Sequence, residues 1–202
     1  MQACEPGRPL VLASSSPRRR ELLAQIGLVP ARILAPAIDE TPRRDELPRL
    51  YVERLARAKV DAARTALESE PGDDPGILIL AADTVVALGR RILPKAEDEV
   101  TARRCLGLLS GRRHRVLTCV VLLHGSSRSE RTVESVVGFS RMTTQQTDAL
   151  IEAGDWQGKA GGYAVQGHAA AFVRFLSGSY SNVVGLPLFE TAQLLRGHGA
   201  LV

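Results

Sequence analysis

Hydrophobic and polar residues follow two different periods along this chain, which indicates that helices and strands alternate in it. From Pro48 to about Glu70, apolar and alanine positions recur every three to five residues with charged residues between them, which predicts one long amphipathic helix. The stretch from Ile77 to Leu88 is almost continuously apolar and partly β-branched, which predicts a strand buried on both faces. A long helix and a central strand therefore follow each other in the chain.

Shorter patterns of the same two kinds place the other elements. Strands are expected at 11–13, 31–35, 92–93, 115–124, 131–141, 163–166 and 170–176, and helices from 17, from about 97 to 109, from 144 to near 154, and from about 188 to 196. Turns are expected at 71–76, 89–91 and 125–127, and Thr143 with Gln146 predicts a capping box. This order predicts an α/β fold, a mixed β-sheet flanked by helices, in a single globular unit over residues 1–202.

The segment 11–23 joins a short apolar run to three serines, Pro17, three arginines and helix-forming residues. Pro17 suits the first position of a helix, and Ser16 suits the N-cap before it. A helix N-terminus among arginines favours a polyanion, and a phosphate chain is the natural ligand. The candidate substrate-binding residues here are Ser14, Ser16, Arg18 and Arg19. An ordinary helix start with solvated arginines would explain the same residues without a ligand.

Asp83 is the most unusual residue, because it places a carboxylate inside an apolar strand, where an uncompensated charge costs several kcal/mol. Glu40 lies on an expected loop before Pro42. Together, Asp83 and Glu40 would form a site of oxygen ligands, which suits Mg²⁺ or Mn²⁺ shared with substrate phosphates. The alternatives are an Asp that hydrogen-bonds neighbouring N–H groups and an ordinary loop acid.

Three further polar residues could serve the same site. Lys59, in the long helix, and Lys95, after Pro94, could meet phosphates, although a solvated surface lysine is the default interpretation of each. Gln166 offers both a donor and an acceptor, the pair needed to recognise the edge of a nucleobase. The four histidines show no metal-ligand spacing, and the chain has no Walker A loop or GxSxG elbow, which argues against kinase and esterase chemistry.

The composition limits which kinds of ligand and which cellular compartment are expected. The net charge of +4, without long basic blocks, favours a small anionic ligand over nucleic acid. The three cysteines are odd in number and far apart in the sequence, which favours a reducing, cytoplasmic location over secretion. No window approaches the ~20 apolar residues that a membrane helix needs, so no membrane partner is expected.

Five ordered blocks of the chain resemble the Maf family of nucleoside triphosphate pyrophosphatases. They are LASSSPRRRELL at 12–23, ADTVV at 82–86, SGRRH at 110–114, AGGYAVQG at 160–167 and GSYSNVVGLP at 178–187. The resemblance spans nearly the whole chain. It implies a cytoplasmic, often dimeric enzyme with an elongated mixed sheet, which uses a divalent metal to cut a nucleoside triphosphate into a monophosphate and pyrophosphate.

The resemblance also implies roles for single residues. Asp83 matches the general base, and Arg18, Thr84 and Gln166 match the positions that select the base in the branch acting on dTTP and UTP. The other active-site charges are matched by Glu40, Lys59 and Lys95. Two alternatives stay open: the same reaction on non-canonical purine triphosphates, and a nucleotide-binding regulator of septum formation.

The sequence departs from the family pattern at two places near these residues. Ala81 stands where a glycine usually precedes Ala-Asp-Thr, and Ala96 follows Lys95 where a proline is usual. Lys95 keeps its distance from Asp83 in the sequence, so we expect Lys95 to keep its role although the shape of its loop can differ.

Overall fold

The computed structural model describes residues 8–69 and 76–200. The strands of its main sheet are β1 (Leu10–Ala13), β2 (Arg32–Leu34), β3 (Leu78–Leu88), β4 (Arg91–Leu93), β6 (Arg113–His124), β7 (Ser127–Phe139) and β9 (Val173–Ser177). Within the described residues these seven strands form one sheet in the order β2-β1-β3-β6-β7-β9, with β4 paired to β3. β1 is parallel to β2 and β3, whereas the other pairs are antiparallel. The expected mixed sheet is confirmed.

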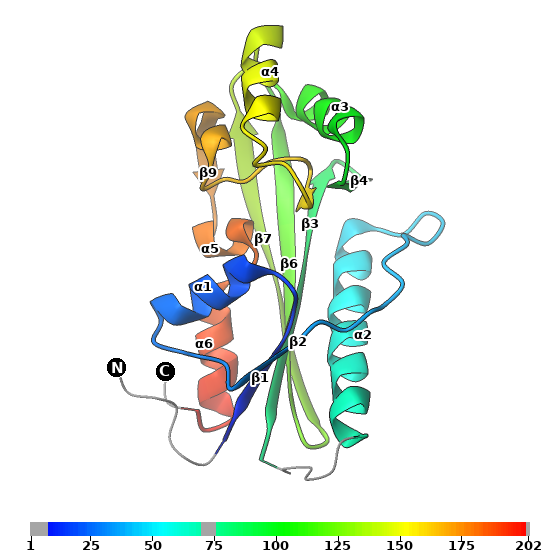
Figure 1. Ribbon diagram of the computed structural model, residues 1–202, viewed down its shortest axis with the longest axis vertical. Coiled ribbons are helices and arrows are strands. Elements are labelled where there is room, and N and C mark those ends of the chain that lie inside the picture. The colour runs from blue at the N-terminus through cyan, green and yellow to red at the C-terminus, as the bar shows by residue number, and fades with distance from the viewer. Residues whose placement is uncertain (1–7, 70–75, 201–202) are drawn as a thin grey trace.

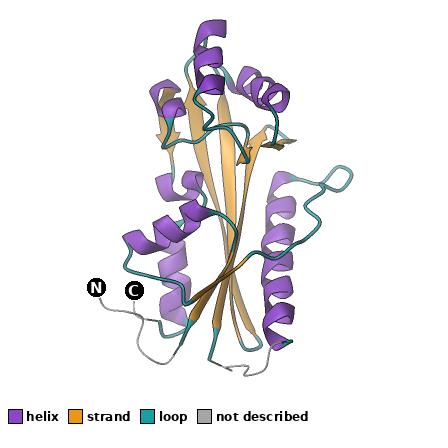
Figure 2. Ribbon diagram, viewed as in Figure 1, coloured by secondary structure: helices purple, strands orange, loops and turns teal. Residues whose placement is uncertain are grey.

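Helices flank this sheet on both sides. They are α1 (Pro17–Gln25), α2 (Pro48–Glu68), α3 (Glu99–Leu109), α4 (Thr144–Glu152), α5 (Tyr180–Val184) and α6 (Leu188–Gly197). The long strands β3, β6 and β7 run through most of the molecule, with α2 along one side, α1 and α6 along the other, and α3 and α4 at the upper end (Figure 1). Figure 2 shows the strands as one layer between these helices. Among the described helices, none has the length and apolar character that crossing a membrane requires.

β3 is buried on both faces, as its apolar run predicts. Side chains alternate along a strand, so residues at odd positions face α2 and residues at even positions face α1 and α6. The set that packs with α2 is Ile79, Ala81, Val85 and Ala87, and the opposite set is Leu78, Leu80 and Ala82. Asp83 and Thr84 therefore point towards opposite faces of the same strand.

Most local predictions are confirmed. The turn at Gly89 leads into β4, and the two residues Gly125 and Ser126 join β6 to β7. Thr143 and Gln146 form the predicted capping box of α4. The predicted turn at 71–76 lies almost wholly outside the described residues, as does Cys4.

The strand predicted at 163–166 is wrong. Gly161 and Gly162 have φ values of 71° and 70°, which a strand does not allow, and the Gly167 N–H donates to the Ala164 carbonyl in a turn. A Cβ added to Gly161 would lie 2.9 Å from Val86, so the chain passes tightly over β3 here. The apolar residues of this segment are buried in a turn, which explains why they imitate a strand pattern.

The strand predicted at 170–176 is right only in its second half. Residues His168–Phe172 form a 3₁₀ helix (η1), and β9 begins at Val173. The Asp155 carboxylate accepts a hydrogen bond of 2.7 Å from the His168 backbone N–H and so satisfies a donor at the start of this helix. A carboxylate thirteen residues away is not visible in a local pattern. A second small sheet, β5 (Lys95–Ala96) with β8 (Lys159–Ala160), was also not predicted.

His114, in β6, is a polar side chain buried in the core. It is 2% exposed, its Nε2 lies 2.7 Å from the Tyr163 hydroxyl, and its ring packs edge-on against Phe139. Burial lowers the pKa of His114 to about 4. The neutral ring is therefore favoured in the folded protein throughout the range in which an unfolded histidine takes up a proton.

This histidine should make the protein acid-sensitive. Because the unfolded ring binds a proton near pH 6.5 and the folded ring only near pH 4, stability falls as the pH drops between these values, by up to about 3 kcal/mol. His114→Gln retains a polar partner for Tyr163 but cannot titrate, so its free energy of unfolding should fall less between pH 7 and pH 4.5. Urea unfolding of both proteins measures the difference, and equal losses would contradict the prediction.

Candidate active site

A gap in strand pairing along one edge of β3 marks the site. β1 pairs with β3 only as far as Ala81, and β4 pairs with it only from Val86. On the opposite edge β6 pairs with β3 without interruption through this segment. Among the described strands, none pairs with residues 82–85 on this edge, so the sheet is open there.

On the α2 face, one ammonium joins two carboxylates. Lys59 Nζ, from α2, lies 2.5 Å from Asp83 Oδ1 and 2.7 Å from Glu40 Oε1. Asp83 and Lys59 are 3% and 8% exposed, so the charge that looked misplaced in an apolar strand is compensated by a buried cation. Lys95 Nζ binds the second oxygen of Glu40. These four residues form a continuous ion-pair network.

The network fixes the charge of Glu40. Partial burial by itself would raise the pKa of Glu40, but hydrogen bonds and charges from Lys59 and Lys95 outweigh it and lower the pKa to about 2. The Tyr51 hydroxyl of α2 donates to the Glu40 carbonyl at 2.9 Å and so holds the loop in place. Glu40 is therefore a carboxylate at any physiological pH.

On the opposite face of β3, the buried cation is Arg19, which contacts Thr84 as Lys59 contacts Asp83. Arg19 is buried, and its Nη2 donates to Thr84 Oγ1 at 3.1 Å, its Nη1 to Ser14 Oγ at 2.9 Å and its Nε to the Gly185 carbonyl at 2.8 Å. These acceptors come from β3, from the loop after β1 and from the end of α5. Arg19 therefore ties these three elements together. All three acceptors are neutral, so none of them neutralises the positive charge of the guanidinium.

The start of α1 faces the same space. Pro17 occupies the first helical turn and Ser16 the N-cap, as predicted, but the Ser16 side chain makes no capping hydrogen bond. Its backbone N–H donates instead to Ser14 Oγ at 3.2 Å. Arg18 is half-buried, and this burial lowers the pKa of its guanidinium, whereas Arg20 is exposed.

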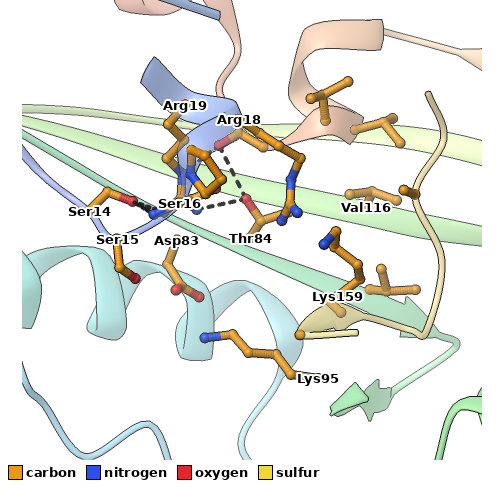
Figure 3. A pocket seen from close by; sticks show the side chains of 18 of the residues that line it. Ser14, Ser15, Ser16, Arg18, Arg19, Asp83, Thr84, Lys95, Val116 and Lys159 are labelled. Atoms are coloured by element: carbon orange, nitrogen blue, oxygen red, sulfur yellow. Dashed lines mark hydrogen bonds between the residues drawn. The ribbon is translucent and has the colours of Figure 1, made fainter. Parts of the chain in front are cut away.

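The ion-pair network, Arg19 and the start of α1 line one cavity of about 320 Å³, a size typical of small-molecule sites. The candidate residues that the sequence indicated all contribute to its wall: Ser14, Ser16, Arg18, Arg19, Glu40, Lys59, Asp83, Thr84, Lys95 and Gln166. Figure 3 shows Asp83 and Lys95 on one side of the space and Arg18, Thr84 and Lys159 on the other.

The far wall of the cavity comes from the turn after β8. Gln166 is exposed and lines the cavity beside the buried side chain of Val165. Lys159 also lines the cavity, but the sequence analysis did not single it out. Its position in a glycine-rich segment gave no pattern that distinguishes it from a surface lysine.

A cation-rich cavity at a break in an α/β sheet suits a phosphorylated small molecule. Residues 9–198 match the Maf-like protein family, and the chain belongs to this family.

Similar proteins carry one name. A protein of Granulibacter bethesdensis named dTTP/UTP pyrophosphatase is 62% identical over 95% of this chain and 93% of its own length. Proteins with the same name from Gluconobacter oxydans and Rhodospirillum rubrum are 60% and 57% identical, over 95% and 96% of this chain and 88% and 92% of their own lengths. The family resemblance seen in the five sequence blocks is confirmed.

The ion-pair network should be visible in stability measurements. Lys59→Met removes the shared cation and leaves Asp83 facing Glu40, which should cost about 3–5 kcal/mol in the free energy of unfolding at pH 7. Adding Asp83→Asn removes one of the two like charges, so the double variant should recover more than about 1 kcal/mol relative to Lys59→Met. Urea unfolding of the two single variants and the double variant measures this coupling; additive costs would show that the three groups do not interact.

Proposed function

We propose that this protein hydrolyses dTTP and UTP to the nucleoside monophosphate and pyrophosphate. The observation that carries the proposal is the ion-pair network at the open edge of β3, where Asp83 and Glu40 meet Lys59 and Lys95 within a single cavity. The names of the similar proteins support the choice of substrate.

Asp83 is assigned the role of general base. Its Oδ1 accepts the Lys59 hydrogen bond, which leaves Oδ2 to accept a proton from water. The water oxygen attacks the α-phosphorus, its proton passes to Asp83, and the bond from that phosphorus to the bridging oxygen breaks, so pyrophosphate leaves. Lys59 holds the carboxylate in position through this hydrogen bond.

Cations around the cavity stabilise the charge of the phosphates. Lys95 and Lys59 face the same side as Asp83, where charge develops on the leaving pyrophosphate. Arg19 contributes its charge from the other face and positions Ser14 and Thr84 through its hydrogen bonds. Ser14 and Ser16 belong to the loop before α1, and the N-terminus of a helix favours phosphate oxygens.

Mg²⁺ or Mn²⁺ fits the donor set only together with the substrate. Asp83 and Glu40 bind one common ammonium, so they are close enough to share a cation. Among the described residues, no cluster of three or more acidic, histidine or cysteine side chains could hold an ion alone. When bound, the ion would neutralise phosphate charge through oxygen ligands that are partly the substrate's own.

Removal of the metal should therefore stop turnover and leave the fold unchanged. Excess EDTA is expected to abolish release of pyrophosphate from UTP, and added Mg²⁺ or Mn²⁺ should restore it, while the thermal unfolding midpoint stays the same. Full activity in excess EDTA would rule out the metal.

Asp83→Asn should lower kcat for UTP by ~10²–10⁴-fold, the usual loss when a general base is removed. The substitution removes a charge but almost no volume, so the variant should still fold. Glu97→Gln, which changes an exposed acid outside the cavity, is the matched control and should leave kcat unchanged. A near-normal kcat for Asp83→Asn in a steady-state pyrophosphate assay would remove Asp83 from the mechanism.

Base selection is assigned to Arg18, Thr84 and Gln166. Uracil and thymine offer one acceptor and one donor side by side, which a fixed side-chain amide can pair with simultaneously. Cytosine reverses this pattern, with an amino donor and a ring-nitrogen acceptor, so an amide held in one orientation by its neighbours would face like groups, at a cost of ~1–3 kcal/mol. The Thr84 hydroxyl lies at hydrogen-bonding distance from Arg19, Thr118 and the Gly185 carbonyl, so its position in the cavity wall is fixed.

A panel of triphosphates tests this assignment and the alternatives. UTP and dTTP should have the highest kcat/KM, with CTP, GTP and ATP about 10- to 100-fold lower. Gln166→Ala should reduce the preference for UTP over CTP more than it reduces basal hydrolysis, whereas Gln193→Ala, an exposed amide on α6, should change neither. Preference for inosine triphosphate would favour the purine alternative, and binding without turnover would favour a regulator.

Two broader expectations accompany this proposal. The cytoplasmic location and the homodimer stay predictions. The free, buried thiols of Cys105 and Cys119 are compatible with a reducing compartment. Sedimentation analysis of the purified protein would test the dimer.

A further inference from the structure

The distribution of lysine in this chain is unusual. Only three of its 26 basic residues are lysines, namely Lys59, Lys95 and Lys159, and the rest are arginines. All three lysines line the same cavity. Wherever a solvated surface cation is sufficient, this chain uses arginine. A compact ammonium with three rotatable donors therefore serves a specific purpose at each of the three cavity positions.

The backbone around Lys159 is firmly positioned. β8, which contains Lys159, pairs with β5, which contains Lys95. The Gly158 N–H donates to the Ala96 carbonyl at 2.8 Å, and the Gly161 N–H donates to the Pro94 carbonyl at 3.0 Å. The small sheet thus places two lysines on one wall of the cavity.

The two lysines face different groups. Lys95 is bound by Glu40, at the carboxylate side of the cavity. The Lys159 side chain is half-buried, its Nζ donates to the Gln157 carbonyl at 2.9 Å, and it points towards Arg18 in Figure 3. Lys159 and Arg18 are therefore two cations that converge on the other side of the same space.

Neighbouring acids compensate these two cations only in part. Burial lowers the pKa of Lys159, and the charge of Arg18 lowers it further, whereas Asp155 acts in the opposite direction. Asp155 already accepts hydrogen bonds from the backbone N–H of His168 and pairs with the His168 ring. Glu21, the acid that influences Arg18, is exposed on α1. Two like charges held together in a partly buried space are stabilised by an anion.

We propose that Lys159 is a further substrate-binding residue, whose ammonium binds an oxygen of the triphosphate chain between itself and Arg18. Arg18 has five N–H donors, so it can contact this oxygen and also keep the contact with the base that the proposed function assigns to it. This inference rests on the proposed function, because it concerns the same substrate and the same cavity. A phosphate oxygen fits two converging cations better than a base carbonyl does, since the carbonyl is neutral and would leave their repulsion uncompensated. Lys159 thus completes a ring of cations around the phosphates, opposite Lys59 and Lys95.

The test separates the phosphate chain from the base. Wild type, Lys159→Met and Lys159→Arg are compared for KM and kcat with UTP, and for competitive inhibition by tripolyphosphate and by uridine. Lys159→Met should raise KM for UTP and the inhibition constant for tripolyphosphate by about 10- to 100-fold, the usual loss for one charged hydrogen bond. Inhibition by uridine should change less than about twofold. Lys159→Arg should restore only part of the affinity for tripolyphosphate, because the position requires a compact ammonium.

Arg104→Met is the matched control, since it removes one exposed positive charge from α3, outside the cavity wall, and should leave all these constants unchanged. Unchanged affinity of Lys159→Met for tripolyphosphate would overturn the inference, and so would weaker uridine binding alone, which would place Lys159 at the base. Calorimetric titration of the wild type and Lys159→Met with tripolyphosphate needs no turnover, so it tests Lys159 even if the wild type fails to hydrolyse UTP. Lys159→Gln replaces Lys159→Met in these measurements should the latter not fold.

Discussion

The site depends on one buried ammonium, that of Lys59, held between Asp83 and Glu40. Each of these charges alone would be costly to remove from water, so their burial is tolerable only when all three are in place. They come from a helix, a central strand and a loop. The same interaction therefore fixes how α2 packs on β3 and where the loop before α2 runs.

Arg19 performs the corresponding task on the other face of β3, but with neutral partners. Lys59 is neutralised by carboxylates, whereas the acceptors of Arg19 are two hydroxyls and a carbonyl, so its charge stays available to an anion. The alternation of a strand places Asp83 and Thr84 on opposite faces, and each meets a cation from a different helix. The cavity thus has a carboxylate on one side and a cation with neutral partners on the other.

Local patterns predicted the parts of this arrangement that depend on local physics. Asp83 could be identified because a carboxylate in an apolar strand requires compensation, and the helix start at Pro17 because proline and serine favour it. The pattern treated Arg18, Arg19 and Arg20 alike. In the structure one is half-buried, one buried and one exposed, because successive helical residues point in different directions.

The wall formed by β8 and the turn after it could not be predicted in this way. β5 and β8 contain two residues each, too few to show a period. The turn at 163–166 is decided by the positive φ of two glycines before it and by contacts with Val86, which are tertiary. For Glu40 and Gln166 the local pattern left an ordinary loop acid and an ordinary amide open as interpretations, and the family resemblance favoured the functional ones.

The interrupted edge of β3 has a consequence for solubility as well as for access. A strand edge without a partner usually invites pairing with another chain, which is a route to aggregation. Here the open segment is limited to residues 82–85 and is bounded by β1 before it and β4 after it. This open segment of four residues is shorter than a typical strand, so a foreign strand would find few backbone groups to pair with. By placing the opening inside the sheet, the fold exposes a strand to its ligand and still protects that strand from other proteins.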